Sequence, residues 1–302
     1  MRVILADSLG FCFGVREALS MADRIHDPHS VTIHGELVHN ERVLYRLETR
    51  GFAITAEPDR ENLPETPRVM ITAHGVSDRE RRRLETAGLR VIDTTCPLVR
   101  RVHRAAQALA DDGRFVILIG RPGHVEVQGI VEDLERFAVL DSASLVRHYG
   151  ERRLGVICQS TTSPRLAEEI LSTIRAANPA ADIEVVDTIC QPTRDRQEAM
   201  RSLLPRVDAV VVVGGKNSNN TRELAALCHA AGKAAWHVQS AADLAPEWFR
   251  GYAVVGLTAG TSTLDETIEE VRRRLEEIEA EPADEPTREM KSTAPTTLRC
   301  AP

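Results

Sequence analysis

The sequence predicts an α/β protein made of three similar small domains, each with a parallel sheet. Short apolar strand signals alternate with amphipathic helix signals almost throughout the 302 residues, which is typical of parallel α/β units. A cysteine follows a strand signal and precedes a helical run three times, at Cys12, Cys96 and Cys190. The last two settings share the pattern V-x-D-T-x-C, which indicates repeated units. A chain of this length also lies near the limit where one core gives way to several domains.

Nine apolar runs are the expected strands. They lie at 2–6, 30–34, 68–73, 89–93, 114–120, 153–158, 183–187, 208–215 and 252–260. Runs with apolar residues at helical spacing lie between and after them, at 15–25, 40–50, 78–87, 97–111, 164–177, 193–204, 221–231 and 264–280. The last run is rich in glutamate and arginine, so we expect one of its faces to be solvated.

The strands group in threes, and each group carries one cysteine loop and two polar or glycine-bearing loops. We therefore expect domains at 13–96, 97–190 and 191–280, with the N-terminal strand within 1–12 completing the third. Residues 281–302 are rich in proline, threonine and charge, which predicts a disordered tail. Ligands bind beyond the carboxyl ends of the strands in open α/β sheets, so three domains facing inward would bring all these loops to one site.

Composition and charge exclude several classes of protein. The net charge of −7 and the pI of about 5.9 argue against nucleic-acid binding. No apolar run approaches the roughly 18 residues of a membrane helix, and the N-terminus lacks signal-peptide features. We therefore expect a cytoplasmic protein with no membrane or nucleic-acid partner. The six cysteines are then thiols or metal ligands. Cys158 and Cys228 lie in apolar runs and are expected to be buried, while Cys300 falls in the tail.

Cys12, Cys96 and Cys190 could hold an iron–sulfur cluster through three thiolates, with one iron left open for chemistry. Spacing alone does not separate ligands from buried thiols, but the repeated setting favours ligands. A cysteine just before a helix also lies where the helix dipole and free N–H groups favour thiolate. A structural zinc site of three cysteines and one histidine is the alternative, although zinc would not explain the polar loops.

Three histidines, His39, His74 and His124, lie in equivalent strand-end loops. Histidine titrates near neutrality, so these side chains could be cationic partners for phosphate or a proton relay. Glu126 stands two residues beyond the last histidine, and in an extended segment both side chains would face the same pocket. Glu126 could serve as a general acid if burial raises its pKa.

Clusters of hydroxyl and amide side chains end apolar strands and open helices at 218–221 and 258–262. A similar cluster follows a strand at 159–162. Such side chains are good N-caps, but several donors around a helix N-terminus also make an anion-binding site, and phosphate is the ligand that such sites typically bind. No Walker A motif accompanies them.

The chain resembles the 4-hydroxy-3-methylbut-2-enyl diphosphate reductase (LytB) family. From about Val3 to about Ile278 it carries, in collinear order, GFCFGV, VHN, AHGV, DTTCPLV, GHxEV, DTIC, RQEA, GGKNSNNT and TAGTS. The resemblance implies a trefoil of three α/β domains around one [4Fe–4S] cluster per chain. It also implies reductive removal of the substrate's allylic hydroxyl as water, which yields isopentenyl and dimethylallyl diphosphate. In the family this is the last step of the methylerythritol phosphate route to isoprenoids.

The resemblance also implies a role for each matching residue. The cluster ligands would be Cys12, Cys96 and Cys190, and the proton donor Glu126. The substrate-binding residues would be His39, His74, His124, Thr161, Ser218, Asn219, Asn220 and Ser262. Because the chain has no second redox motif, electrons would come from reduced ferredoxin or flavodoxin.

The chain departs from the family pattern at a few positions. Val125 stands where the family usually has proline, Ile130 begins a replacement of the common G-T-x-G run, and Leu264 replaces a frequent proline. Asn219 lies at a variable position, and the choice of Thr161 depends on counting from Gln159. Two rival functions stay open. One is a cluster-bearing paralogue that acts on another allylic diphosphate, and the other is a non-enzymatic regulator that binds a phosphorylated ligand.

Overall fold

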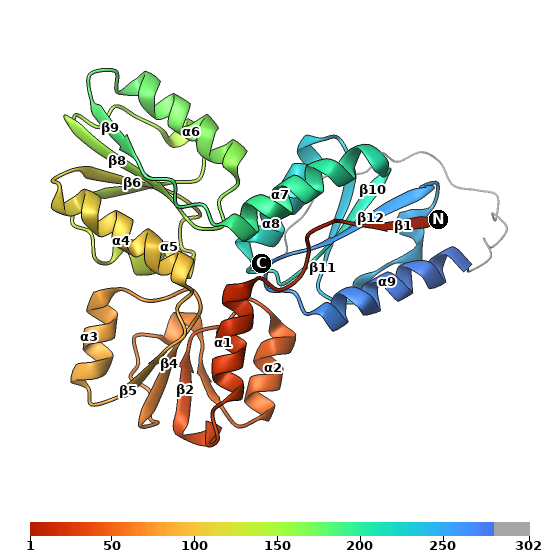
Figure 1. The fold of residues 1–302 in the computed structure, drawn as a ribbon, viewed down its shortest axis with the longest axis horizontal. Coiled ribbons are helices and arrows are strands. Elements are labelled where there is room, and N and C mark those ends of the chain that lie inside the picture. The colour runs from red at the N-terminus through yellow and green to blue at the C-terminus, as the bar shows by residue number, and fades with distance from the viewer. Residues whose placement is uncertain (281–302) are drawn as a thin grey trace.

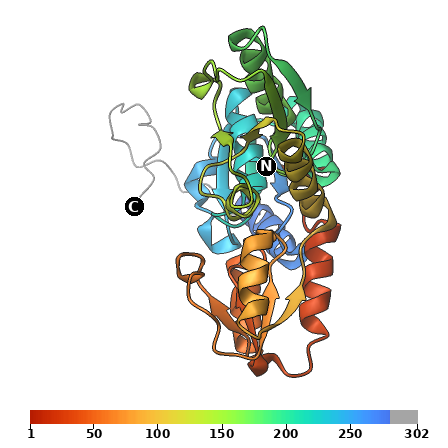
Figure 2. The ribbon, with the colours of Figure 1, turned by 90° about the vertical axis from the view of Figure 1, so that its left-hand side faces the viewer.

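The computed structural model describes residues 1–280. Three four-stranded parallel sheets, each flanked by helices, form three lobes around a common centre (Figure 1). The view turned by 90° is narrower, so the lobes make a flattened body (Figure 2). The predicted α/β trefoil is confirmed. The predicted tail at 281–302 lies outside the described residues.

All three sheets have the same strand order. The first sheet has the order β3-β2-β4-β5, with β2 at Val31–His34, β3 at Ala53–Thr55, β4 at Arg68–Ile71 and β5 at Arg90–Asp93. The second has the order β7-β6-β8-β9, with β6 at Phe115–Ile119, β7 at Phe137–Leu140, β8 at Arg153–Cys158 and β9 at Asp182–Val185. The third has the order β11-β10-β12-β1, with β10 at Ala209–Val213, β11 at Ala234–Val238, β12 at Val254–Ala259 and β1 at Arg2–Leu5. The N-terminal strand thus fills, in the third sheet, the place of β5 and β9.

The nine expected strands are all present, but each sheet has a further edge strand that the sequence analysis missed. These are β3, β7 and β11, and each occupies the same edge of its sheet. Most of their residues are exposed or half-buried, so their apolar signal is weak. By contrast, all five residues of β10 are buried. A strand covered by helices on both faces becomes continuously apolar, and an edge strand does not.

The eight expected helices are present, with ends that differ by up to two residues. They are α1 (Phe13–Asp23), α2 (Glu41–Thr49), α3 (Asp78–Thr86), α4 (Pro97–Asp111), α6 (Pro164–Ala177), α7 (Gln191–Leu203), α8 (Asn219–Ala230) and α9 (Asp265–Ala280). A further helix, α5, spans Val125–Val131. It was missed because its seven residues include Gly129 and are too few to establish a helical period.

Helices cover the sheets and leave the strand ends free. α4 and α5 pack on one face of the second sheet, and α6 packs on the other. α7 and α8 share a core on one side of the third sheet, and α9 lies on the other. α1 and α2 share a core with β2 and β4 of the first sheet. Because the helices take the faces, the carboxyl ends of the strands and the loops that follow them are available for a site.

Candidate functional site

The three cysteines occupy equivalent positions in the three lobes. Cys12, Cys96 and Cys190 are the N-cap residues of α1, α4 and α7. Each backbone N–H donates to a carbonyl in the loop after the third strand of a sheet. These bonds are Cys12 N to Thr261 O at 3.0 Å, Cys96 N to Ala73 O at 3.1 Å and Cys190 N to Ser160 O at 2.9 Å. This repeated bond brings all three thiols to one pocket.

The surroundings of the thiols suit a bound metal group. All three cysteines are unpaired, and no acidic residue lies in the first turn of α1, α4 or α7. The helix N-termini therefore offer uncompensated positive potential to an anionic group. Burial raises the pKa of Cys190 to about 11 and also raises the pKa of Cys96. Free thiols here keep their protons, and a metal that binds them would displace those protons.

Gly14 lets α1 approach the thiol of Cys96. A Cβ placed on Gly14 would lie 2.5 Å from Cys96 Sγ, which is closer than any real contact. Within residues 1–280, no group of three or more histidine, cysteine or acidic side chains is arranged around a single ion. A mononuclear zinc site needs all its ligands on one ion, whereas a cluster can bind each cysteine through a different iron. Three thiols at three helix N-termini around one pocket are a donor set that suits an iron–sulfur cluster.

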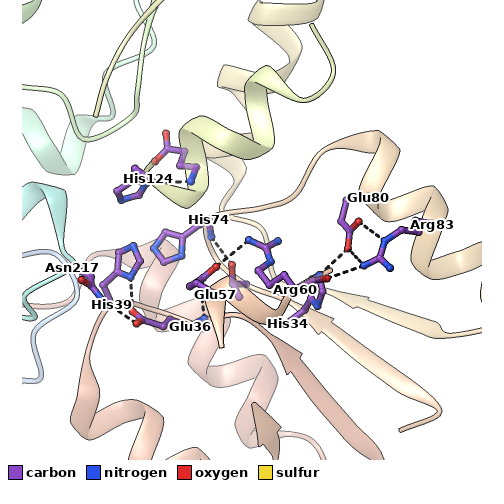
Figure 3. Close-up of polar contacts among 12 residues, drawn as sticks. His34, Glu36, His39, Glu57, Arg60, His74, Glu80, Arg83, His124 and Asn217 are labelled. Carbon is purple, nitrogen blue, oxygen red and sulfur yellow. Dashed lines mark hydrogen bonds and ion pairs between the residues drawn. The ribbon is translucent and has the colours of Figure 1, made fainter. Parts of the chain in front are cut away.

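Three histidines line the same pocket and touch one another (Figure 3). The rings of His39 and His74 stack with centroids 4.1 Å apart, and His124 meets them edge-on at 5.1 and 5.8 Å. Burial lowers the pKa of His124 to about 3 and holds that of His74 well below its usual value, and the charge of His39 adds to both shifts. His74 and His124 are therefore mostly neutral near neutral pH in the ligand-free pocket.

Two ring nitrogens in this cluster have no partner. His39 Nε2 and His74 Nδ1 are buried and make no hydrogen bond with any described residue. Leaving such groups unpaired costs about 1–3 kcal/mol each, and phosphate oxygens would relieve that cost. The pocket is therefore built to receive hydrogen-bonding atoms from a ligand.

Glu36 and Asn217 hold His39 in place, and the sequence analysis missed both. Glu36 Oε2 lies 2.7 Å from His39 Nδ1, and Asn217 Nδ2 donates to Glu36 Oε1 at 3.0 Å (Figure 3). Burial opposes ionisation of Glu36, but the bond from His39 keeps its pKa below the usual value. The bond engages Nδ1 and leaves Nε2 available to a ligand. The only signal in the sequence was an acidic residue three positions before the histidine.

Glu126 is the one carboxyl group of the pocket. It lies in the first turn of α5, so the expectation of an extended segment is wrong; His124 is the N-cap, and its Nδ1 accepts from Glu126 N at 3.1 Å. Ser160 donates to the carboxyl through its N–H at 2.7 Å and its hydroxyl at 2.9 Å. Only 2% of Glu126 is exposed. Burial outweighs the bonds from Ser160 and raises the pKa of Glu126 to about 7.

The polar loops contribute groups that differ in their freedom. Ser218 caps α8, and Ser262 Oγ donates to His39 O at 3.0 Å. Asn219 Nδ2 donates to the hydroxyl of Thr161 at 3.1 Å and so joins the third lobe to the second. Asn220 is fully buried, and neither atom of its amide has a partner among the described residues. Asn220 is therefore free to bind a ligand.

Every site residue predicted from the sequence lines this one pocket. The set is Cys12, His39, His74, Cys96, His124, Glu126, Thr161, Cys190, Ser218, Asn219, Asn220 and Ser262. Cys158 and Cys228 are buried elsewhere, as predicted, and burial raises the pKa of each to about 12. Val125 begins α5, a position where valine and proline are both tolerated, so this departure leaves the helix intact.

We compared the chain with models of known protein families. A family model described as LytB protein matches residues 3–276. The chain belongs to the LytB protein family. No helix within residues 1–280 has the length and apolar character needed to cross a membrane.

Several relatives of this LytB chain carry one name. A 4-hydroxy-3-methylbut-2-enyl diphosphate reductase of Aquifex aeolicus is 35% identical over 91% of this chain and 96% of its own length. The reductase of Methylibium petroleiphilum is 38% identical over 92% of this chain and 86% of its own length.

Two solved structures share the fold. One, described as (E)-4-hydroxy-3-methyl-but-2-enyl diphosphate reductase, the terminal enzyme of the non-mevalonate pathway, is 33% identical with a TM-score of 0.61 and covers 92% of this chain and all of its own. The other is the E-1-hydroxy-2-methyl-but-2-enyl-4-diphosphate reductase of Plasmodium falciparum. It is 25% identical with a TM-score of 0.83 and covers 96% of this chain and 95% of its own.

Proposed function

We propose that this protein is a 4-hydroxy-3-methylbut-2-enyl diphosphate reductase, the last enzyme of the methylerythritol phosphate route to isoprenoids. The observation that carries the proposal is one pocket that holds three equivalent cysteines, three histidines and a buried carboxyl group. The names of the LytB relatives support it. The reaction consumes two electrons and two protons and releases the allylic hydroxyl as water.

Cys12, Cys96 and Cys190 would hold a [4Fe–4S] cluster. When bound, it supplies electrons and an open iron for the substrate hydroxyl. The three cysteines belong to three lobes, so all lobes must be correctly placed for the cluster to bind. Unpaired thiols of this kind suit a reducing compartment such as the cytoplasm. Reduced ferredoxin or flavodoxin would deliver the electrons.

The diphosphate would bind between the histidines and the N-terminus of α8. The unpaired nitrogens of His39 and His74 and the free amide of Asn220 face this space. His124 and Ser218 line it from the other lobes, with Asn219 and Ser262 beside them. The helix N-terminus adds N–H groups and positive potential, both of which favour a phosphate group.

Glu126 would hold a proton for the leaving hydroxyl. Because burial raises its pKa to about 7, the carboxyl group can hold a proton near neutral pH, donate it and take up another in each cycle. Ser160 orients the carboxyl group through two hydrogen bonds. Thr161 follows Ser160 directly and lies beside the reacting end of the pocket.

The domain limits expected from the sequence form part of the proposal. The domains would span 13–96, 97–190 and 191–280, and each would begin at the residue that directly follows a cysteine. Each limit would then fall at the point where a cysteine enters its helix. The pairing of β1 with β12 supports placing the N-terminal strand in the third domain.

The test is an anaerobic assay of reconstituted protein with 4-hydroxy-3-methylbut-2-enyl diphosphate and a chemical reductant. We expect isopentenyl and dimethylallyl diphosphate as products, and a brown protein that contains iron and sulfide. Turnover of another allylic diphosphate but not this one would assign the protein to the paralogue instead. A colourless protein that contains one zinc and shows no turnover would contradict the proposal.

A further inference from the structure

Two arginines border the pocket from outside. Arg121 lies in the loop after β6, and Arg222 lies in the first turn of α8. With Asn219 and Thr162 they line a groove of about 460 Å³. Within residues 1–280, no ion pair or side-chain hydrogen bond engages either guanidinium group. Both guanidinium groups are therefore available to bind an anion, which arginine recognises through its fork of N–H donors.

The two guanidinium groups repel each other. Burial and then the charge of Arg222 hold the pKa of Arg121 below its usual value, and no carboxylate opposes these effects. Asp141 and Glu223 also line the groove, but neither forms an ion pair with these arginines in the described chain. The carboxyl group of Glu223 shares a hydrogen bond with Ser163. Burial raises the pKa of Glu223, so this carboxyl group is a weaker counter-charge.

The groove and the pocket share a wall. Asn219 lines both cavities, and its amide donates to Thr161 O at 3.2 Å and to Thr161 Oγ1 at 3.1 Å across the boundary. The charge of Arg121 also reaches into the pocket, where it adds to the lowering of the pKa of His124. Among the described residues, the ligand-free pocket is lined by at least two neutral histidines and by no arginine or lysine. The cations lie beside it instead.

We propose that Arg121 and Arg222 form a capture site that binds the diphosphate group of the substrate before it enters the pocket. The inference rests on the proposed function, because it takes the ligand of the pocket to be a diphosphate. A phosphate group between the two guanidinium groups would receive several charge-assisted hydrogen bonds and cancel their repulsion. Unpaired charges beside a site also raise association rates at low salt, whereas the neutral donors inside act only at contact.

The experiment compares Arg121→Gln, Arg222→Gln and the double variant with wild-type holoenzyme. The control is Arg250→Gln, since Arg250 is exposed and precedes β12, at the end of the third sheet away from the pocket. kcat and kcat/KM are measured anaerobically from about 0.03 to 0.5 M KCl, a range over which the Debye length falls severalfold. The affinity for inorganic diphosphate is measured by calorimetry over the same range.

We expect each single substitution to lower kcat/KM roughly threefold to tenfold at low salt, with kcat changed less than twofold. The difference should disappear at high salt, and the double variant should lose most of the salt dependence of both kcat/KM and diphosphate affinity. Melting temperatures should equal or exceed that of the wild type, because repulsion is removed. Behaviour like that of Arg250→Gln, or an equal loss of kcat at every salt concentration, would overturn the proposal.

Failure of the capture site and failure of the proposed function give different results. If wild-type enzyme reduces the substrate while the arginine variants match the control, only the capture site is wrong. If the wild type shows no turnover but binds inorganic diphosphate with the expected salt dependence, the capture site stands and the proposed reaction fails. Melting temperatures lowered in both single variants would show that the pair stabilises the fold, and would also overturn the proposal.

Discussion

At the scale of single residues, the site depends on burial more than on charge. Burial raises the pKa of Glu126 and lowers those of His74 and His124, so the ligand-free pocket holds mostly neutral groups. A neutral pocket accepts an apolar allylic chain at little desolvation cost, and its unpaired donors and acceptors can then form hydrogen bonds with the ligand. Burial also raises the pKa of the Cys96 and Cys190 thiols, so these two keep their protons until a metal displaces them.

Glu126→Gln should slow the chemical step roughly 10²–10⁴-fold, which is the usual contribution of a general acid. Glutamine keeps the size of the side chain but has no acidic proton. Substrate binding should largely survive, because apart from His124 the expected diphosphate contacts lie on other loops. The measurement is anaerobic single turnover, with iron content as the control. Near-wild-type turnover with an intact cluster would transfer the acid role to Thr161 or a bound water.

Each single serine substitution of Cys12, Cys96 or Cys190 should bleach the holoenzyme and abolish turnover. The reason is that a hard oxygen ligand is a poor substitute for thiolate. Cys158→Ser is the matched control. That cysteine is buried in the second lobe and lines no part of the pocket, so its variant should retain iron and colour. A colourless Cys158→Ser protein, or a fully loaded Cys96→Ser protein, would contradict the assignment of ligands.

At the scale of elements, the helix N-termini make the site. α1, α4 and α7 each begin at a cysteine, and α5 and α8 begin at His124 and Ser218. Free N–H groups and positive helix ends therefore point at one region from all three lobes. The close approach of α1 to Cys96 leaves no room for a side chain at Gly14.

Gly14→Ala should lower the iron content and reduce the free energy of unfolding by about 1–2 kcal/mol. The added Cβ would collide with Cys96 Sγ, and such overpacking usually costs about 1–3 kcal/mol of stability. The better helix propensity of alanine offsets part of this loss. Urea unfolding and iron assay provide the two measurements. Glu17→Ala, at an exposed position of α1, should alter neither. Normal iron content in the Gly14 variant would show that α1 can shift without loss of the site.

At the scale of the whole molecule, buried neutral histidines link stability to pH. Burial lowers the pKa of His34 to about 4 and that of His124 to about 3, and it holds the pKa of His74 well below its usual value. His34 is fully buried beside Glu80, with Nε2 2.8 Å from Oε1 (Figure 3). In the unfolded chain these rings take up protons near pH 6.5. The unfolded state therefore binds more protons below that pH, so stability falls as pH decreases.

The free energy of unfolding of cluster-free protein should therefore decrease between pH 6.5 and pH 4, with His34 contributing at most about 3 kcal/mol. Urea unfolding at about pH 5 and pH 7 measures the loss. His34→Gln should reduce the difference between the two pH values, whereas substitution of the exposed His148 should not. Equal urea midpoints at both pH values in the wild type would contradict this prediction.

The sequence alone determined the repeated architecture and the members of the pocket. The pattern V-x-D-T-x-C, the placement of His39, His74 and His124 after strands, and the continuous apolar strands are local features. These local features predict the structure because central parallel strands must be buried on both faces, and because the carboxyl ends of the strands lie at the same edge of each sheet. Every residue predicted for the site therefore lines one cavity.

Only the tertiary structure decided the states of these groups. The edge strands β3, β7 and β11 and the short helix α5 have weak local signals and form because neighbouring segments pack on them. The pKa of Glu126 and the mutual repulsion of Arg121 and Arg222 depend on groups far apart in the chain. Desolvation and long-range charge act through space, so no reading of neighbouring residues determines them.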